Sequence, residues 1–454
     1  MKEKPAAHAY ANRDPTRRTA AGMSRLIAVR PGERTAFFWS SSYFFALLCS
    51  YYIVRPMRDE MGIAGGVEHL QWMFSATFVV MLAAVPVFGW VTRRFSVGRF
   101  LPYVYLFFIA NLLLFFLLFK STTAGTYVAR AFFIWASVFN LFIVSVFWSL
   151  MADIFDADQA RRLFGMIAAG GTLGALTGPA LTAALVIQLG PTNLLPLSAA
   201  FLGWAVVCIH RLIAWRTSTG TVRPGKLAPE ADVGLGGSIV AGVQLIVRSP
   251  YLIGICLLML LFTTLATFLY FQQAHIVRLN VDDPARRTAL FAGMDFTVNA
   301  LTLFLQVLLT GRIVGRFGLG WTLALIPLLL TLGFLVLGFS PVLGVLVVIQ
   351  VLRRAGNYAI MRPAREMLYV VLGKAEKYKA KNIIDTVVYR GGDAVSAWAF
   401  AGLMGIGFSA AGISLVAAPL AAVWALIAFR LGKRQEQLAR SAGQPGSAAD
   451  STRR

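Results

Sequence analysis

Long uncharged apolar runs recur along the whole chain and restrict what it can fold into. A helix needs roughly 20 apolar residues to cross the hydrocarbon core of a bilayer. Five runs have the length of one crossing: residues 35–54, 70–92, 100–119, 131–152 and 249–274. Each predicts one membrane-spanning helix, which argues against a soluble protein.

Three further runs are too long for one crossing, and each has a turn signal near its middle. They are residues 163–209 with Gly190-Pro191, residues 317–352 with Ser340-Pro341, and residues 394–429 with the small residues 409–412. Glycine, proline and serine favour turns, so each run predicts two antiparallel spans. Residues 289–309, interrupted only by Asp295, add one more. We therefore expect an all-α integral membrane protein with twelve transmembrane helices.

The basic residues lie between the predicted spans. The chain has a net charge of +22, although only 14% of its residues are charged. Arg and Lys gather near both ends, in the central loop and after the second, fourth, eighth and tenth spans, whereas the opposite turns carry almost no charge. The positive-inside bias then predicts cytoplasmic N and C termini in the inner (plasma) membrane of a cell. The bilayer is the expected partner, and no nucleic acid is expected.

One short pattern occurs twice in the chain. Its copies, 222 residues apart, are Gly89, Arg94-Phe95 and Gly98, then Gly311, Arg316-Phe317 and Gly320. The pair Gly170-Gly171 recurs at nearly the same offset as Gly391-Gly392. We therefore expect two similar six-helix bundles. The first copy resembles the signature turn between the second and third helices of major facilitator transporters, although Thr92 stands near the place of that signature's aspartate.

This duplication predicts five parts along the chain. They are a cytoplasmic leader (1–34), an N-terminal bundle (35–214), a central cytoplasmic linker (215–248), a C-terminal bundle (249–431) and a cytoplasmic tail (432–454). In the linker, Ile239, Val240, Val243 and Ile246 have helical spacing. This spacing is typical of a short helix at the membrane interface and equally of an N-terminal extension of the seventh span.

Gly170, Gly174 and Gly178 fall on one stripe of the fifth predicted span and are followed by Pro179. Glycine at this spacing lets two helices approach backbone to backbone, which favours helix packing. The stripe also resembles the glycine-proline motif of facilitator antiporters, although it lacks the closing glycine pair.

Ionisable residues inside the predicted spans are candidates for function. Each costs at least roughly 2.5 to 3.5 kcal/mol to place in a bilayer without a partner or a cavity. Arg353 and Arg354 follow Pro341 by roughly 18 Å of helix, which places them near the middle of the membrane. Asn357 lies on the same face as Arg353. Two adjacent cations with no acid in their own helix before Glu366 suit an anionic ligand.

Other charges in the spans have two interpretations. Asp295 is either a proton carrier or the partner of one of these arginines. Arg390 and Asp393 have the i, i+3 spacing of an internal ion pair. The end of the first span carries Arg55, Arg58, Asp59 and Glu60.

At these positions the chain resembles the ATP/ADP translocase family of plastids and intracellular bacteria, which is related to the major facilitators. Residues 357–372 and 379–385 are similar to the family's tenth helix and the loop after it. The agreeing residues are Tyr358, Pro363, Glu366, Met367, Tyr369, Lys379, Lys381, Ile384 and Asp385. In the first half, residues 52–59 are similar to the end of the family's first helix, and residues 147–154, with Asp153, match a second family segment.

The resemblance implies a nucleotide ligand, with departures at three positions. The family's nucleotide-binding lysines fall at Arg58 and Asn357, and its aspartate before the proline falls at Arg362. Arginine keeps the positive charge at position 58. Its planar guanidinium has hydrogen-bond donors in a fixed geometry, whereas the lysine ammonium is a compact charge. Arg353 and Arg354, one turn from Asn357, can replace the charge lost there. The ligand can therefore differ from ATP.

We predict a secondary-active, alternating-access transporter for an anionic solute such as a nucleotide or another organic phosphate. The predicted substrate-binding residues are Arg55, Arg58, Arg353, Arg354, Asn357 and Lys379. The predicted coupling or gating residues are Asp59, Asp153, Asp295, Glu366, Arg390 and Asp393. A coupling proton or a counter-transported solute is expected, in a monomer without cofactor or metal.

Two other functions fit the same sequence. The glycine-proline stripe and Asp295 fit a proton-coupled exporter of an amphipathic or lipid-like solute. A non-transporting membrane scaffold is the alternative from another class. An enzyme is not expected, since the four histidines are scattered and the chain has neither an HExxH motif nor a GxxxxGK[ST] loop.

Overall fold

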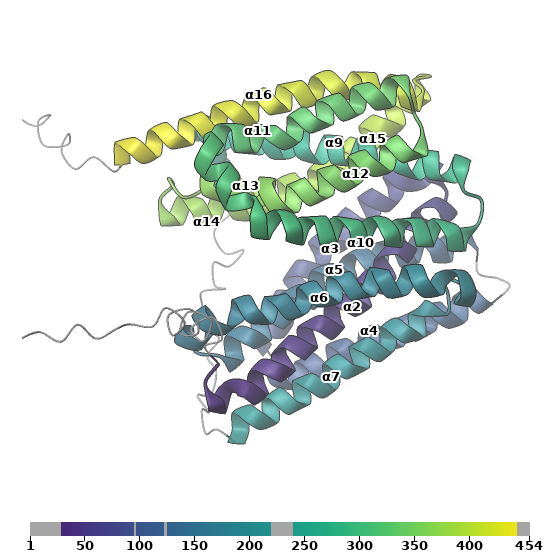
Figure 1. The fold of residues 1–454 in the computed structure, drawn as a ribbon, viewed down its shortest axis with the longest axis vertical. Helices are drawn as coiled ribbons and strands as arrows, with labels where there is room; N and C mark the ends of the chain where they lie inside the picture. Colours follow the sequence, from purple (N-terminus) through teal and green to yellow (C-terminus); the bar gives the residue numbers. More distant parts are fainter. Residues whose placement is uncertain (1–28, 95–96, 122–124, 219–238, 443–454) are drawn as a thin grey trace, which may run out of the picture.

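The computed structural model describes residues 29–94, 97–121, 125–218 and 239–442, and the described chain is almost entirely helical (Figure 1). Most of the predicted leader, much of the central linker and the end of the tail lie outside the described residues, as does Phe95 of the first repeated pattern.

The helices form two groups that follow the two halves of the sequence. The N-terminal half contains η1 Pro31–Glu33, α2 Arg34–Ala64, η2 Val67–His69, α3 Leu70–Arg94, α4 Val97–Lys120, α5 Thr126–Ile154, α6 Ala157–Leu189 and α7 Leu194–Ser218. The C-terminal half contains α8 Ile239–Arg248, α9 Pro250–Asn280, α10 Pro284–Leu308, α11 Thr310–Phe339, α12 Leu343–Gly356, η3 Asn357–Met361, α13 Arg362–Leu368, α14 Lys374–Ile383, η4 Ile384–Val388, α15 Tyr389–Gly405 and α16 Ala410–Ala442.

Eleven helices of the described chain are long and apolar enough to cross a membrane. The remaining predicted span, the eleventh, corresponds to α15, which has 17 residues and continues α14 and η4 without a break. The count of twelve therefore stays a prediction.

Several predicted boundaries move in the structure. The α2 helix is 31 residues long, so Arg55, Arg58 and Asp59 lie inside it and do not end it. The last turn precedes α16 at residues 406–409, where Gly407 has a φ of 95°, and not at residues 409–412. The α16 helix also runs to Ala442, beyond the predicted bundle limit at residue 431.

Other expected features are present. The fold-back at Gly190 separates α6 from α7, with a φ of 78° that favours glycine. The second copy of the repeated pattern lies in the first part of α11, where Gly318 breaks the helix with a φ of 73°. The short helix of the linker forms as α8, separate from α9, and packs on α14.

The glycine stripe of α6 packs directly on the backbone of α2. A Cβ atom on Gly170 would lie 2.6 Å from the carbonyl oxygen of Ser41, and one on Gly178 would lie 2.7 Å from that of Cys49. Small residues let the two backbones approach, so helix packing accounts for this stripe.

The two halves meet along α2 and α6, which pack on α10, and along α3, which packs on α15. The hydrophobic core of the C-terminal half also includes Ile63, Leu70, Met73 and Phe133 from the N-terminal half. They come from the end of α2 and the beginnings of α3 and α5, at the right of Figure 1, and we call this end of the molecule the closed end. The α7 helix, which ends at Ser218, and the α16 helix, which ends at Ala442, both end at the left of Figure 1, which we call the open end.

Candidate functional site

An ion cluster joins the two halves. Asp295 of α10 accepts a hydrogen bond from Arg354 of α12, and its other oxygen lies 3.6 Å from Nε of Arg55 on α2. The side chain of Asp295 is only 1% exposed. A buried carboxylate is costly unless it is paired. The structure therefore places Asp295 as the partner of an arginine from each half.

Two more arginines flank this contact. Arg353 donates to Oε1 of Gln350 at 2.9 and 3.1 Å, and within the described chain it has no acidic partner. Arg58 lies 3.0 Å from Oδ1 of Asp59, and its guanidinium is 4.1 Å from the centre of the Phe133 ring. Such a contact with an aromatic face favours a cation.

We define the central cluster as these six charged residues: Arg55, Arg58, Asp59, Asp295, Arg353 and Arg354. Four cations and two anions leave an excess of two positive charges between the halves. Uncompensated charge inside a membrane protein is costly, so this excess suits a negatively charged ligand.

Polar contacts between the halves close the end opposite Ser218. Arg287 lies 3.5 Å from the buried Glu60, and Arg278 lies 2.9 Å from the exposed Glu68. Tyr270 also donates to Asp59 at 3.1 Å, so the central cluster is tied to this closed end.

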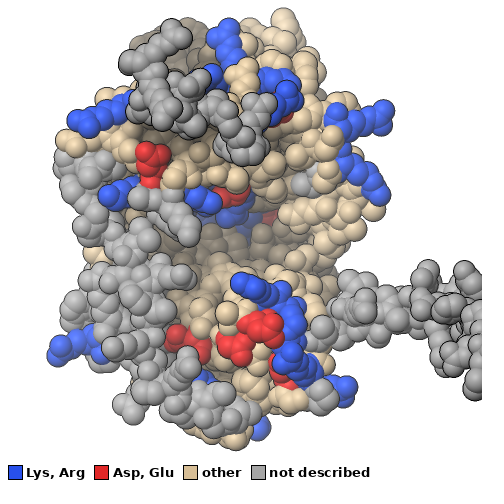
Figure 2. All heavy atoms as spheres, turned by 90° about the vertical axis from the view of Figure 1, so that its left-hand side faces the viewer, with Lys and Arg blue, Asp and Glu red and all other residues tan. Residues whose placement is uncertain are grey.

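A cavity of about 610 Å³ lies between the halves. Its lining comes from α3 and α5 of the N-terminal half and from α9, η3, α13, α14, η4 and α15 of the C-terminal half. Figure 2 shows the open end of the molecule hollowed between the two halves, with basic and acidic side chains around the hollow. The volume falls within the roughly 300–1,000 Å³ of small-molecule sites.

Two π-helical turns shape this cavity. Asn357 and Tyr358 belong to η3, whereas Asp385 and Thr386 belong to η4, and all four line the cavity. A π-helical turn is rare and frequently found at functional sites, because it widens the helix and turns side chains out of their regular positions.

Most charged groups of the cavity are paired. Lys381 lies 2.5 Å from Glu366, and Arg365 lies 3.8 Å from Asp385. Arg390 lies 3.9 Å from Asp393, as the i, i+3 spacing predicted. Four cations and two anions line the cavity, and Asp393 compensates the lining Arg390, so the cavity carries one excess positive charge, at Arg362.

The structure separates the residues predicted from sequence into three groups. Asn357, Glu366 and Arg390 line the cavity, and Asp393 pairs with Arg390. Arg55, Arg58, Asp59, Asp295, Arg353 and Arg354 form the central cluster and do not line it. Lys379 is exposed on α14, and Asp153 lies near the end of α5, so both lie apart from the cavity lining.

Sequence reasoning missed several lining residues. The polar ones are Asn140, Ser145, Tyr358, Arg362, Arg365, Lys381, Asp385, Thr386 and Tyr389. Lys381 and Tyr358 belong to the segment that resembles the translocases, and this signal could have identified them. The neutral Asn140, inside an apolar span, carried no comparable signal.

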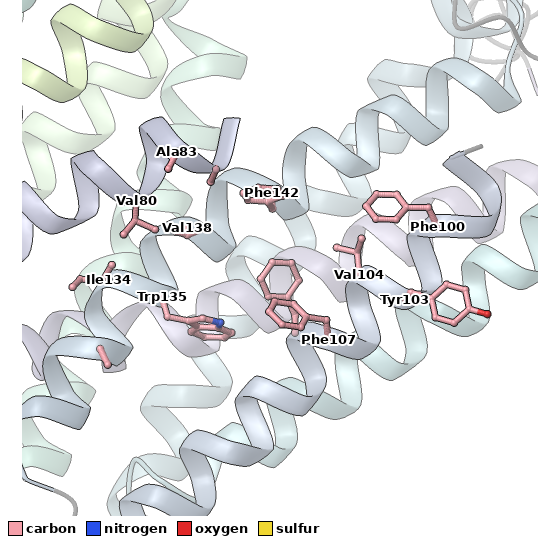
Figure 3. Close-up of a pocket in the computed structure, with 13 residues that line it drawn as sticks. Val80, Ala83, Phe100, Tyr103, Val104, Phe107, Ile134, Trp135, Val138 and Phe142 are labelled. Carbon is pink, nitrogen blue, oxygen red and sulfur yellow. The ribbon is translucent and has the colours of Figure 1, made fainter. Parts of the chain in front are cut away.

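A second, apolar groove of about 850 Å³ lies outside this site, on α3, α4 and α5. Figure 3 shows Val80 and Ala83, the aromatic side chains of Phe100, Tyr103 and Phe107, and Trp135 around it. The groove has no charged lining residue, so it does not suit an anionic solute.

Two helical halves around a charged central cavity define the class of polytopic membrane carriers. The sequence pattern of the Major Facilitator Superfamily matches residues 35–290, more than half of the chain. The chain belongs to this superfamily and is a multi-pass membrane transporter.

Its relatives include two curated proteins of chlamydiae. ADP,ATP carrier protein 1 of Chlamydia trachomatis serovar D is 24% identical over 363 residues, which cover 69% of this chain and 65% of the relative. The protein of the same name from Chlamydia muridarum is 24% identical over 361 residues with the same coverage. The chain is thus distantly related to these carriers and spans 65% of their length.

Solved structures share the fold. A crystal structure of the nucleoside transporter NupG matches with a TM-score of 0.63 and 12% identity, covering 87% of this chain and 99% of that chain. The D-xylose-proton symporter matches with a TM-score of 0.62 and 11% identity, covering 88% of this chain and 98% of that chain. At these identities the likeness shows the fold alone.

Proposed function

We propose that the chain is a secondary-active carrier that moves a small anionic solute by alternating access. The observation that carries this proposal is the cavity between the halves, which has an excess positive charge at Arg362 and faces the open end (Figure 2). The ion pairs Glu60–Arg287 and Glu68–Arg278 close the opposite end. A carrier that faces one side at a time needs this combination.

The solute class is a nucleotide or another organic phosphate. Guanidinium groups bind phosphate through paired hydrogen bonds, and arginines occur in both the cavity and the central cluster. The names of the chlamydial ADP,ATP carrier proteins support the same class.

The central cluster acts after the ligand has entered the cavity. Tyr358 lines the cavity one helical turn from Arg354, so the cluster begins directly behind the cavity wall. In this proposal Arg55, Arg58, Arg353 and Arg354 receive the ligand's charge while Asp59 and Asp295 hold the arginines in place. Glu366, Arg390 and Asp393 then act as gating groups at the cavity.

The finer assignments belong to the same proposal. The carrier has twelve spans, with α15 as the eleventh, and both termini face the cytoplasm from the inner (plasma) membrane. The structure then represents the inward-open state. A proton or a counter-transported solute couples transport in a monomer.

Reconstitution tests this function. Purified full-length protein in liposomes should take up or exchange labelled nucleotides or sugar phosphates above the level of empty vesicles. Replacement of Arg353 by Gln should lower the rate at least about tenfold, because hydrogen bonds to charged groups contribute about 1.5–3 kcal/mol. The exposed Arg434→Gln variant is the matched control. No flux of any organic phosphate would refute the solute class.

A second candidate function is export of an amphipathic or lipid-like solute. The apolar groove favours it, because α3 and α5 supply lining residues to both the groove and the charged cavity. Flux of a lysophospholipid in the same liposomes, blocked by Ala83→Trp in the groove, would support this function over the first.

A further inference from the structure

The two walls of the cavity differ in chemistry. All of its charged lining residues belong to the C-terminal half, on α13, α14, η4 and α15. The N-terminal wall is built from α3 and α5 and consists of Phe78, Met81, Leu82, Asn140, Leu141, Val144 and Ser145. A ligand that fills the cavity therefore meets cations on one side and a mainly apolar surface on the other.

Three polar side chains that line the cavity have no hydrogen-bond partner within the described part of the chain. They are Arg362, which is exposed, and Asn357 and Asn140, which are half-buried. Arg365 and Lys381, in contrast, each have an acidic neighbour. The two half-buried amides are costly unless water or a ligand satisfies them, and the exposed guanidinium of Arg362 is accessible to a ligand.

The unpartnered groups lie on both walls. Arg362 begins α13 and Asn357 belongs to η3, in the C-terminal half, whereas Asn140 belongs to α5, in the N-terminal half. A guanidinium suits a phosphate, to which it can donate two parallel hydrogen bonds. A side-chain amide both donates and accepts, so it suits the base or ribose of a nucleoside.

We propose that the cavity binds a nucleoside phosphate across the interface, with the phosphate on Arg362 and the nucleoside between Asn140 and Asn357. This proposal rests on the proposed function and assigns the parts of the ligand to residues. Phe78 and Leu141 pack against the uncharged base from the N-terminal wall, while Tyr358 faces it from η3. Arg362 then distinguishes a nucleotide from its nucleoside.

Calorimetric titration of the full-length protein in nanodiscs tests this arrangement with adenosine 5′-monophosphate, adenosine and inorganic phosphate. Arg362→Gln should weaken binding of the monophosphate at least about tenfold and leave adenosine binding unchanged. Arg362→Lys should restore part of the lost affinity, because lysine keeps the positive charge but lacks the paired hydrogen-bond donors of the guanidinium group. Arg434→Gln, an exposed arginine on α16, should alter neither affinity.

The asparagines provide the complementary test. Asn140→Leu and Asn357→Leu should each weaken the binding of adenosine and of its monophosphate by a similar factor, about fivefold. The affinity for inorganic phosphate should stay the same. Size-exclusion profiles and thermal unfolding check that each variant is folded.

The outcomes separate the two proposals. Suppose that the wild type transports nucleotides, but Arg362→Gln weakens the binding of adenosine and of the monophosphate equally, or changes neither affinity. The arrangement is then wrong and the proposed function stands. If the wild type binds none of the three probes and transports no organic phosphate, both are wrong. If it binds phosphate alone, the nucleoside assignment is wrong.

Discussion

Arg55 on α2 and Asp295 on α10 face each other across the two halves, with 3.6 Å between Nε and Oδ2. Arg354 holds the other oxygen of the same aspartate from within the C-terminal half. The carboxylate of Asp295 thus contacts Arg354 within the C-terminal half and Arg55 in the N-terminal half. In the alternating access that we propose, the halves rock against each other, so the Arg55 contact would change during the cycle while the Arg354 contact would persist.

Replacement of Asp295 by Asn should destabilise the protein strongly. Arg55 and Arg354 would keep their charges without the buried carboxylate, and breaking such a pair costs about 3–5 kcal/mol. Thermal unfolding of the purified protein should show a lower midpoint than for the wild type. The exposed Glu376→Gln on α14 is the control and should leave the midpoint unchanged.

A double-mutant cycle isolates the contact between the halves. The double variant with Arg55→Gln and Asp295→Asn should lose less stability than the sum of the losses in the two single variants. The reason is that each single change leaves an unpaired charge. Strictly additive losses would show that Arg55 and Asp295 do not interact.

The central cluster shows how far sequence reasoning reached. The charges of Arg353, Arg354 and Asp295 were recognisable as costly in an apolar span, and the repeat predicted two halves. The choice between proton carrier and ion-pair partner for Asp295 stayed open, because the face of α2 that meets α10 depends on packing between distant segments. For the same reason the sequence does not show that Arg55 pairs with Asp295.

The cavity lining was harder to predict. A regular α-helix advances by about 100° per residue, so the one extra residue in a π-helical turn rotates everything that follows. The η3 turn therefore changes which side chains of α13 share a face with Arg353, and the η4 turn changes which side chains of α15 share a face with α14. Arg362, which follows η3, lines the cavity.

Acid should weaken the contact between η1 and α6 at the open end. Arg162 donates to both carboxylate oxygens of Glu33, at 2.9 and 3.1 Å, and these hydrogen bonds lower the pKa of Glu33 from 4.5 to about 2. Because the folded pKa lies below the unfolded value, the stabilisation is complete above pH 4.5 and is lost as the pH falls toward 2.

Thermal unfolding between pH 6 and pH 3 measures this effect. The Glu33→Gln variant should unfold at a lower temperature than the wild type at pH 6, and the difference should shrink as the pH falls. Arg162→Gln should show the same trend, because it removes the cause of the pKa shift. A difference that stays constant over this range would contradict the assignment.

Two glycines of α6 should respond to alanine in opposite directions. A Cβ atom at Gly170 would lie 2.6 Å from the Ser41 carbonyl oxygen, whereas one at Gly165 would meet nothing within 4 Å. Gly170→Ala should lower stability by about 1–3 kcal/mol, since a packed interface tolerates extra volume poorly. Gly165→Ala should raise it by about 0.5–1 kcal/mol through better helix propensity. Equal shifts of the two unfolding midpoints would argue against close packing of α6 on α2.

The closed end contains two ion pairs between the halves that should differ in importance. Glu60 and Arg287 are 1% and 12% exposed, whereas Glu68 and Arg278 are 60% and 51% exposed. An exposed pair contributes about 0–1 kcal/mol, while removing one partner of a buried pair costs about 3–5 kcal/mol. Arg287→Gln should therefore open the closed end, and Arg278→Gln should do so much less.

Accessibility of an introduced cysteine measures this opening. Met73 is buried where the halves meet, and Met73→Cys should react slowly with a membrane-impermeant maleimide in an otherwise wild-type background. Labelling should accelerate at least about tenfold with Arg287→Gln and less than about fivefold with Arg278→Gln. These factors follow from the free energies of the buried and the exposed ion pair. The exchanged pair Glu60→Arg with Arg287→Glu should slow labelling again, because it restores opposite charges at the same positions. Equal labelling in both single variants would mean that burial does not decide which pair holds this end shut.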